Sequence, residues 1–225
     1  MTPSPGIAHL PIQKIQDAGI QATIDELAIE EPLEIRLQYG PAADRQERSV
    51  SITMRTPGND TELATGFLYT EGIIPGVTAI DLVSTFTSNS ILLSLKTTVP
   101  LDLGRLQRHF YTTSSCGVCG KSSLEALRTV CPAPQRDSHW LVTPDIIYDL
   151  PNQLRRQQDI FGSTGGLHAA ALFDTQGNIL SLKEDIGRHN ALDKLIGANL
   201  QDSNLPLNKH ILLLSGRACF ELIQK

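Results

Sequence analysis

Short runs in which hydrophobic and polar residues alternate recur along the chain, and this alternation is typical of half-buried β-strands. Residues 33–37 and 50–54 show it, and the Gly- and Pro-containing segment 40–44 between them has the composition of a turn. A second alternating region covers residues 80–98, with turn residues near 88–90. The pattern predicts an antiparallel hairpin followed by one or two further strands.

Other segments carry apolar residues at helical spacing. This spacing predicts helices over residues 60–72, over 143–161 with an interruption at Pro151, and over 190–200. A shorter helical turn is expected at residues 103–110. Each longer helix follows a break in the chain that contains Pro, Gly or a capping residue, which supports its start.

The second half of the chain alternates strands and helices more regularly. Strands are expected at residues 168–173 and 179–182, joined by a turn, and a buried strand at 211–214. The segment Ser215-Gly216-Arg217 follows that buried strand and precedes the start of another helix. Strands alternating with helices are typical of an α/β protein.

The length of 225 residues allows one large domain with a small appendage. We expect residues 1–23 to be a flexible leader, residues 24–110 an N-terminal β-rich part, and residues 111–225 the core. The leader lacks the basic start and apolar stretch of a secretory signal, which favours a cytoplasmic protein. No apolar run approaches the length of a membrane span. The net charge of −5 argues against general nucleic-acid binding.

The chain has four cysteines, too few and too unevenly spaced for a disulfide scaffold. Cys116 and Cys119 form a Cys-x-x-Cys motif, whereas Cys131 and Cys219 stand alone. The residues from Ser122 onward have the cap and spacing of a helix start. Backbone N–H groups at that position would lower the pKa of a thiol and raise its thiolate fraction, so the motif is a candidate for sulfur chemistry.

Three other interpretations of the Cys-x-x-Cys motif remain open. A zinc site would need more ligands, which Cys131, His139 and His168 could supply if they converge. A thioredoxin-type redox motif usually follows a strand near the N-terminus, whereas this one lies in mid-chain. The two cysteines could also simply pack in a glycine loop.

Three polar loops near predicted strand ends suggest a site for an anionic ligand. Gly165 and Gly166 allow close backbone approach, and His168 follows them. Arg188, His189 and Asn190 lie at a strand-to-helix junction, where helix N–H groups and an Arg can bind an anion. The third loop consists of Ser215, Gly216 and Arg217. Taken singly, the first loop is more often a turn than a binding site, and the second is equally typical of a solvated helix start.

Taken together and in this order, six motifs resemble the formate dehydrogenase accessory sulfurtransferase family, FdhD. They are Glu30-Glu31-Pro32-Leu33, Thr56-Pro57-Gly58-Asn59-Asp60 with Gly66-Phe67-Leu68, Cys116-Gly117-Val118-Cys119-Gly120, Thr164-Gly165-Gly166-Leu167-His168-Ala169-Ala170, Asp185-Ile186-Gly187-Arg188-His189-Asn190-Ala191-Leu192-Asp193-Lys194 and Leu214-Ser215-Gly216-Arg217. The resemblance covers about residues 28 to 225.

The resemblance implies an α/β fold similar to cytidine deaminases, a mixed sheet with flanking helices plus a small β-rich subdomain. It implies that a cysteine desulfurase supplies sulfur as a persulfide on Cys116, with Cys119 as its partner. The sulfur would then pass to the molybdenum of a bis(molybdopterin guanine dinucleotide) cofactor, a bound substrate destined for formate dehydrogenase. A homodimer is also implied, and no resident metal is expected.

The resemblance also suggests which residues bind the guanine dinucleotide. The matching loops contain Gly165, Gly166, His168, Arg188, His189, Asn190, Ser215, Gly216 and Arg217. The chain ends inside a predicted helix, whereas members of this family continue for several tens of residues, so we expect that a C-terminal portion is missing. The main alternative is a non-catalytic chaperone that holds the cofactor. A zinc-dependent deaminase is disfavoured because Ala169 and Ala170 follow His168, which leaves no His-x-Glu motif.

Overall fold

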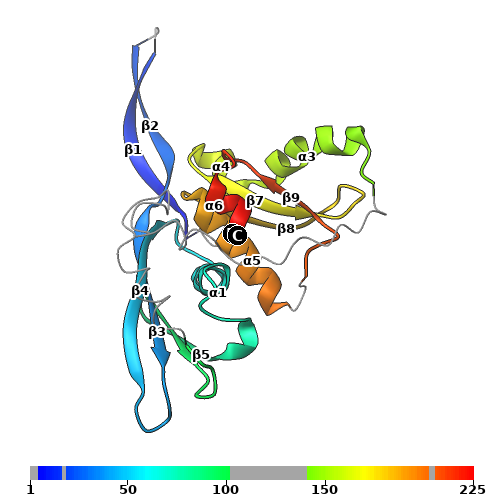
Figure 1. Cartoon of the computed structure of the whole chain (residues 1–225). Coiled ribbons are helices and arrows are strands. Elements are labelled where there is room, and N and C mark those ends of the chain that lie inside the picture. The colour runs from blue at the N-terminus through cyan, green and yellow to red at the C-terminus, as the bar shows by residue number, and fades with distance from the viewer. Residues whose placement is uncertain (1–4, 17–18, 102–140, 203–205) are drawn as a thin grey trace.

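A four-stranded sheet with one covering helix forms the N-terminal part of the computed structural model, which describes residues 5–16, 19–101, 141–202 and 206–225 (Figure 1). The strand order is β4-β3-β6-β5, and β3 pairs with β6 in parallel while the other pairs are antiparallel. The strands are β3 (Glu31–Tyr39), β4 (Gln46–Arg55), β5 (Ile80–Thr87) and β6 (Ser90–Leu95). The predicted hairpin and the two later strands are therefore confirmed.

The core of this part follows from the period-two alternation of β3. Leu33, Ile35 and Leu37 are buried on one face, where they pack with Leu63 and Leu68 of helix α1 (Asp60–Thr70). A short 3-10 helix, η1 (Val77–Ala79), leads from α1 towards β5. The predicted helix after residue 60 is confirmed, and it ends at Thr70, two residues before the glycine expected to stop it.

Residues 7–16 and 19–28 pair as a separate two-stranded hairpin, β1 (Ile7–Gln16) and β2 (Gly19–Ala28), where the sequence predicted a flexible leader up to residue 23. Figure 1 shows it projecting from the rest of the chain. Its apolar residues are largely exposed, with Ile15 at 77% and Ile20 at 69%. The pattern was missed because these strands have no buried face to impose a clear alternation. Pro11 is tolerated because a two-stranded hairpin consists only of edge strands.

The C-terminal part is a three-stranded antiparallel sheet in the order β8-β7-β9, with helices on both faces. Its central strand is buried on both sides: Ala170 and Leu172 pack with helix α5, whereas Ala171 and Phe173 pack with helix α3. The elements are α3 (Pro144–Gln157), α4 (Asp159–Thr164), β7 (His168–Phe173), β8 (Ile179–Asp185), α5 (Arg188–Gln201), β9 (Ile211–Leu214) and α6 (Phe220–Gln224). The predicted α/β class is confirmed.

Two details of this part differ from the prediction. Helix α3 runs through Pro151 without interruption. Pro151 and Ile147 are exposed, so water can bond the backbone oxygen of Ile147 that the missing N–H of the proline leaves unpaired. Strand β9 was expected to be buried, but Leu212 is 46% exposed. The described pairing of β9 is with β7 alone. None of the described helices is long and apolar enough to cross a membrane.

Helices α1 and α5 cross at two glycines, and this crossing joins the two parts (Figure 1). A Cβ atom on Gly66 would collide with the backbone oxygen of Asp193, and one on Gly197 would collide with that of Glu62. The two backbones can approach this closely only because both side chains are absent. The crossing therefore fixes α5, and with it the loop that precedes α5, against the N-terminal sheet.

Candidate functional site

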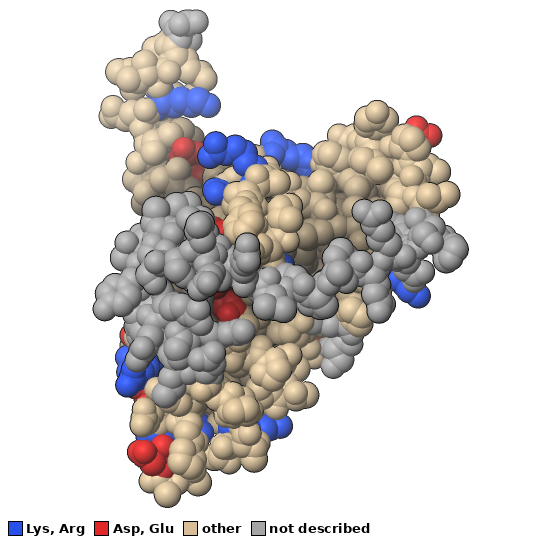
Figure 2. All heavy atoms as spheres, viewed as in Figure 1, with Lys and Arg blue, Asp and Glu red and all other residues tan. Residues whose placement is uncertain are grey.

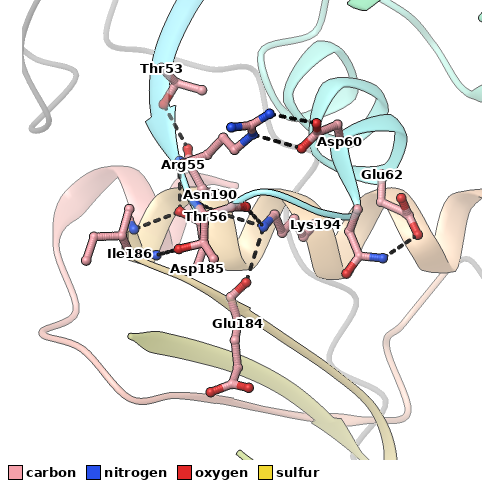
Figure 3. Close-up of polar contacts among 12 residues, drawn as sticks. Thr53, Arg55, Thr56, Asp60, Glu62, Glu184, Asp185, Ile186, Asn190 and Lys194 are labelled. Carbon is pink, nitrogen blue, oxygen red and sulfur yellow. Dashed lines mark hydrogen bonds and ion pairs between the residues drawn. The ribbon is translucent and has the colours of Figure 1, made fainter. Parts of the chain in front are cut away.

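A buried ion pair joins α5 to the end of β8, beside the segment that follows β4 (Figure 3). Lys194 Nζ lies 2.7 Å from Asp185 Oδ2, and both side chains are at most 2% exposed. The same Nζ donates hydrogen bonds to the backbone oxygens of Thr56 at 2.9 Å and Glu184 at 3.3 Å. A buried charge is tolerated only when it is paired and hydrogen-bonded in this way. We call Asp185, Asn190, Lys194 and their partners at residues 53–56 the polar joint.

Asn190 belongs to the polar joint. Its Nδ2 donates to the backbone oxygen of Met54 at 2.8 Å and to Asp185 Oδ1 at 3.0 Å, while its Oδ1 accepts a hydrogen bond from Thr53 Oγ1 at 3.1 Å. Figure 3 shows the amide between β4 and the loop after β8. Its side chain is thus occupied with holding two parts of the chain together, and its predicted role in cofactor binding stays a prediction.

Next to the polar joint, Arg55 gives Asp60, the last residue of the Thr56–Asp60 motif, a structural role. Its guanidinium is 1% exposed and donates to both carboxylate oxygens of Asp60, at 3.0 and 2.9 Å. One of its nitrogens also donates to the backbone oxygen of Ser88 at 2.8 Å. A bidentate pair of this kind fixes the orientation of both partners. Arg55 therefore ties the end of β4 to the first turn of α1.

Three of the predicted site loops meet around Gly216. A Cβ atom on Gly216 would lie 3.2 Å from Cδ of Arg188 and 3.3 Å from Nδ1 of His168. Ser215 fixes the loop, because its Oγ accepts a hydrogen bond from the backbone N–H of Ala169 at 2.8 Å. The fold thus brings together residues that are some 20 to 50 positions apart. We call His168, Arg188 and Gly216 the Gly216 cluster.

Positive charge is available next to this cluster. Arg217 is exposed, and Arg188 is half-buried, with an Nε atom that is buried and has no hydrogen-bond partner among the described residues. Lys and Arg side chains gather between the β1–β2 hairpin and α3 on the face seen in Figure 2. An orphaned guanidinium nitrogen beside a glycine backbone is a suitable place for an anionic oxygen.

Gly165 and Gly166 lie at the C-terminal end of α4, close to the β1–β2 hairpin. Gly165 ends α4 in the left-handed conformation, with φ of 68°, and its N–H bonds to the backbone oxygen of Phe161. Gly166 is exposed, and a Cβ there would lie 3.3 Å from the Cβ of Ala28 in β2. Their geometry is that of a turn, as one of the two interpretations of this loop expected. Their assignment to cofactor binding stays a prediction.

Glu184 supports the same region from the opposite end of α4. Its carboxylate accepts hydrogen bonds from the backbone N–H groups of Ile160 at 3.1 Å and Phe161 at 2.9 Å. Burial raises the pKa of Glu184, and these hydrogen bonds only partly oppose the effect. The first turn of α4 is thus held by a partly buried carboxylate.

His189 points away from the Gly216 cluster, towards α6. Its Nε2 lies 3.4 Å from Sγ of Cys219 and 3.3 Å from Oε2 of Glu221. Burial lowers the pKa of His189 to about 4, helped by the positive charges of Lys225 and Arg188. The imidazole is therefore neutral at pH 7. Neither Cys219 nor Glu221 was among the predicted site residues, because only the fold brings them to His189.

Cys116 and Cys119, with Cys131, lie outside the described residues. Their distance from the Gly216 cluster and their part in the chemistry remain predictions from the sequence.

A protein-family model described as FdhD/NarQ family matches residues 28–225. The chain belongs to this family. A relative in the FdhD/NarQ family, the sulfur carrier protein FdhD of Streptomyces coelicolor, is 45% identical over 94% of this chain and 76% of its own length. The protein of the same name from Mycolicibacterium paratuberculosis is 48% identical over 89% of this chain and 74% of its own length.

A solved structure shows the fold of the FdhD/NarQ family in the same way. It is a crystal structure from Desulfotalea psychrophila, provisionally described as a formate dehydrogenase accessory protein. It matches with a TM-score of 0.70 over 98% of this chain and 79% of that chain, at 20% sequence identity. The resemblance inferred from the six sequence motifs is thereby confirmed at the level of family and fold.

Proposed function

We propose that this chain is a sulfur carrier in the maturation of formate dehydrogenase. It takes sulfur from a cysteine desulfurase as a persulfide on Cys116 and passes it to the molybdenum of a bis(molybdopterin guanine dinucleotide) cofactor. The observation that carries the proposal is the match over nearly the whole chain to relatives named sulfur carrier proteins. The convergence of His168, Arg188 and Gly216 supports it, because it offers a site for the phosphates of such a substrate.

The loading step needs only thiol chemistry. The Cys116 thiolate attacks the terminal sulfur of the desulfurase persulfide, a new S–S bond forms, and the desulfurase cysteine leaves as a thiolate. No electron acceptor is required, because one S–S bond is exchanged for another. The product is a persulfide on Cys116, whose terminal sulfur is the cargo.

The delivery step uses the second cysteine. The Cys119 thiolate attacks the inner sulfur of the Cys116 persulfide, which forms a Cys116–Cys119 disulfide and releases the terminal sulfur as sulfide. The two electrons that reduce this sulfur come from the two cysteines. The sulfide would then become a ligand of the molybdenum in the substrate, in exchange for an oxygen ligand that leaves as water. A cellular dithiol must reduce the disulfide before the next cycle.

The Gly216 cluster would hold the substrate during delivery. Arg188 and Arg217 supply positive charge for the phosphates, and the absence of a side chain at Gly216 lets an anion approach the backbone. His168 adds an imidazole to the same place. We further propose that the chain works in the cytoplasm as a homodimer, with the desulfurase and the dehydrogenase as transient partners.

Intact-mass spectrometry after incubation with a cysteine desulfurase and cysteine tests the proposal. The expected result is a reductant-sensitive gain of one sulfur atom, which peptide mapping places on Cys116. Loading is expected to disappear in Cys116→Ala and to persist in Cys131→Ala, the matched control. Full loading of Cys116→Ala would overturn the assignment. So would a Cys116→Ala/Cys119→Ala variant that still supports full dehydrogenase activity, because a cofactor-holding chaperone would then suffice.

A further inference from the structure

Three side chains with metal-binding atoms converge at the end of the described chain. His189 Nε2, Cys219 Sγ and a carboxylate oxygen of Glu221 all lie within 4.8 Å of one another. They come from two segments: His189 is in the first turn of α5, whereas the other two lie at the start of α6. All three residues are half-buried.

The spacing of these atoms fits a tetrahedral site. Zinc binds imidazole nitrogen, carboxylate oxygen and thiolate sulfur at about 2.0 to 2.3 Å, so tetrahedral ligands lie about 3.3 to 3.6 Å from one another. The distances from His189 Nε2 are 3.4 Å to Cys219 Sγ and 3.3 Å to Glu221 Oε2. The third distance, from Cys219 Sγ to the Glu221 carboxylate, is within 4.8 Å. One ion could therefore contact all three side chains after a shift of about 1 Å at most between the sulfur and the carboxylate.

Protons alone satisfy this arrangement poorly. Nε2 of His189 faces both Cys219 and Glu221, and a neutral imidazole nitrogen either donates one hydrogen bond or accepts one. If Nε2 donates its proton to the Glu221 carboxylate, the Cys219 sulfur has to share that one proton. If it accepts from the thiol, the carboxylate oxygen faces a lone pair. A cation at the shared point would bind all three groups at once.

The surrounding charges are compatible with a divalent ion. A Cys219 thiolate and the Glu221 carboxylate would together balance its charge, and His189 would bind through the lone pair of its Nε2. The nearest described cations are Arg188 and Lys225. Lys225 is itself neutralised, because its Nζ lies 2.7 Å from Asp193 and 3.7 Å from Glu71.

We propose that His189, Cys219 and Glu221 bind one divalent transition-metal ion of the zinc type. Sulfur and imidazole ligands select zinc over magnesium or calcium, and three protein ligands leave a fourth position for water. The ion would tie α6 to the first turn of α5, beside the Gly216 cluster. This site differs from the zinc site considered for the Cys-x-x-Cys motif, and it does not depend on the proposed sulfur transfer.

Cobalt(II) is the direct probe, because a thiolate bound to cobalt gives a charge-transfer absorption band. In a Cys116→Ser/Cys119→Ser/Cys131→Ser variant, Cys219 is the one cysteine left of the four. We expect one equivalent of cobalt, the thiolate band, and displacement by zinc. Adding Cys219→Ser should abolish the band, and His189→Ala or Glu221→Gln should weaken affinity about tenfold or more. His9→Ala, on the distant β1–β2 hairpin, is the matched control and should change nothing.

A second measurement needs no substitution. In the unchanged protein, zinc should slow alkylation of Cys219 by iodoacetamide, followed by mass spectrometry of its peptide, because a metal-bound thiolate is shielded. An unchanged alkylation rate with zinc, or a cobalt complex without a thiolate band in the Cys219-only variant, would overturn the proposal. Undiminished affinity in a folded His189→Ala variant would do the same.

Discussion

The polar joint and the Gly216 cluster lie at the two sides of the same motif, residues 185–194, and differ in how completely their polar atoms are paired. In the polar joint, Asp185, Asn190 and Lys194 are buried and bonded to one another or to the chain around residues 53–56. In the Gly216 cluster, Arg188 is half-buried, and its Nε has no partner among the described residues.

Helical periodicity explains the difference. Asn190 and Lys194 are four residues apart, so they share the face of α5 that meets the end of β4. His189 and Asp193 share the next face, where Cys219 and Lys225 lie. Arg188 is left for the loop at Gly216. A motif that looks like one functional unit in sequence is therefore divided by the helix into one structural face and two further faces, which carry the residues of the proposed metal and anion sites.

The largest effect is expected from breaking the polar joint. Lys194→Met leaves Asp185 buried without its cation, and we expect a loss of about 3 to 5 kcal/mol in the free energy of unfolding. Urea denaturation measures it. Lys183→Met is the matched control, because Lys183 pairs with Glu62 at 3.5 Å near the surface and should contribute at most about 1 kcal/mol. Equal losses in the two variants would show that the polar joint is not what holds α5.

Gly66→Ala tests the helix crossing that supports the polar joint. The added methyl group would meet the backbone of α5 at Asp193, which cannot yield as a side chain could. We expect destabilisation of about 1 to 3 kcal/mol or more by thermal or urea unfolding. Gly162→Ala, in α4, is the control, because a Cβ there meets nothing within 4 Å and should be neutral or slightly stabilising. A neutral Gly66→Ala would contradict the close crossing.

A smaller, pH-dependent effect is expected from Glu184. Burial raises the pKa of Glu184 in the folded chain. At a pH just above the ordinary pKa of a glutamate, the folded state therefore still holds a proton that the unfolded state has lost. Stability from this group is therefore present at low pH and declines as pH rises through the shifted pKa. The difference in unfolding free energy between the wild type and Glu184→Gln should fall across that range. A difference that rises with pH would have the wrong sign.

The smallest stability change is expected in the Gly216 cluster, where a binding effect should dominate. Arg188→Gln removes a charge that no described partner needs, so the unfolding free energy should change by about 0.5 kcal/mol or less. Binding of guanosine diphosphate, measured by calorimetry, should weaken about tenfold, since a charge-assisted hydrogen bond is lost. Unchanged binding would remove Arg188 from the proposed substrate site.

Much of the fold could be predicted because its strands and helices have one or two buried faces that impose a period on the sequence. The alternation at residues 33–37 and the helix over 190–200 are examples. The β1–β2 hairpin was missed because its apolar side chains remain exposed. No periodic signal separates such a strand from an irregular leader.

The candidate site was predictable only as a set of loops. That Arg188, His168 and Gly216 meet depends on β7 lying between β8 and β9, which the sequence does not state. Asn190 looked like a ligand-binding residue, but its partner Thr53 is 137 positions away. Cys219 looked solitary for the same reason, since His189 reaches it only when α6 folds back beside α5.

The crossing of α1 and α5 also restricts the number of residues that can connect β8 to α5, because it fixes the rotation of α5 about its own axis. Each residue of a helix turns it by about 100°. One residue inserted between Asp185 and Arg188 would have to bulge out of the loop, or else rotate α5 by that angle. Rotation would carry Lys194 away from Asp185 and bring a side chain to the place of Gly197. This short connection is therefore where the chain should tolerate length changes least.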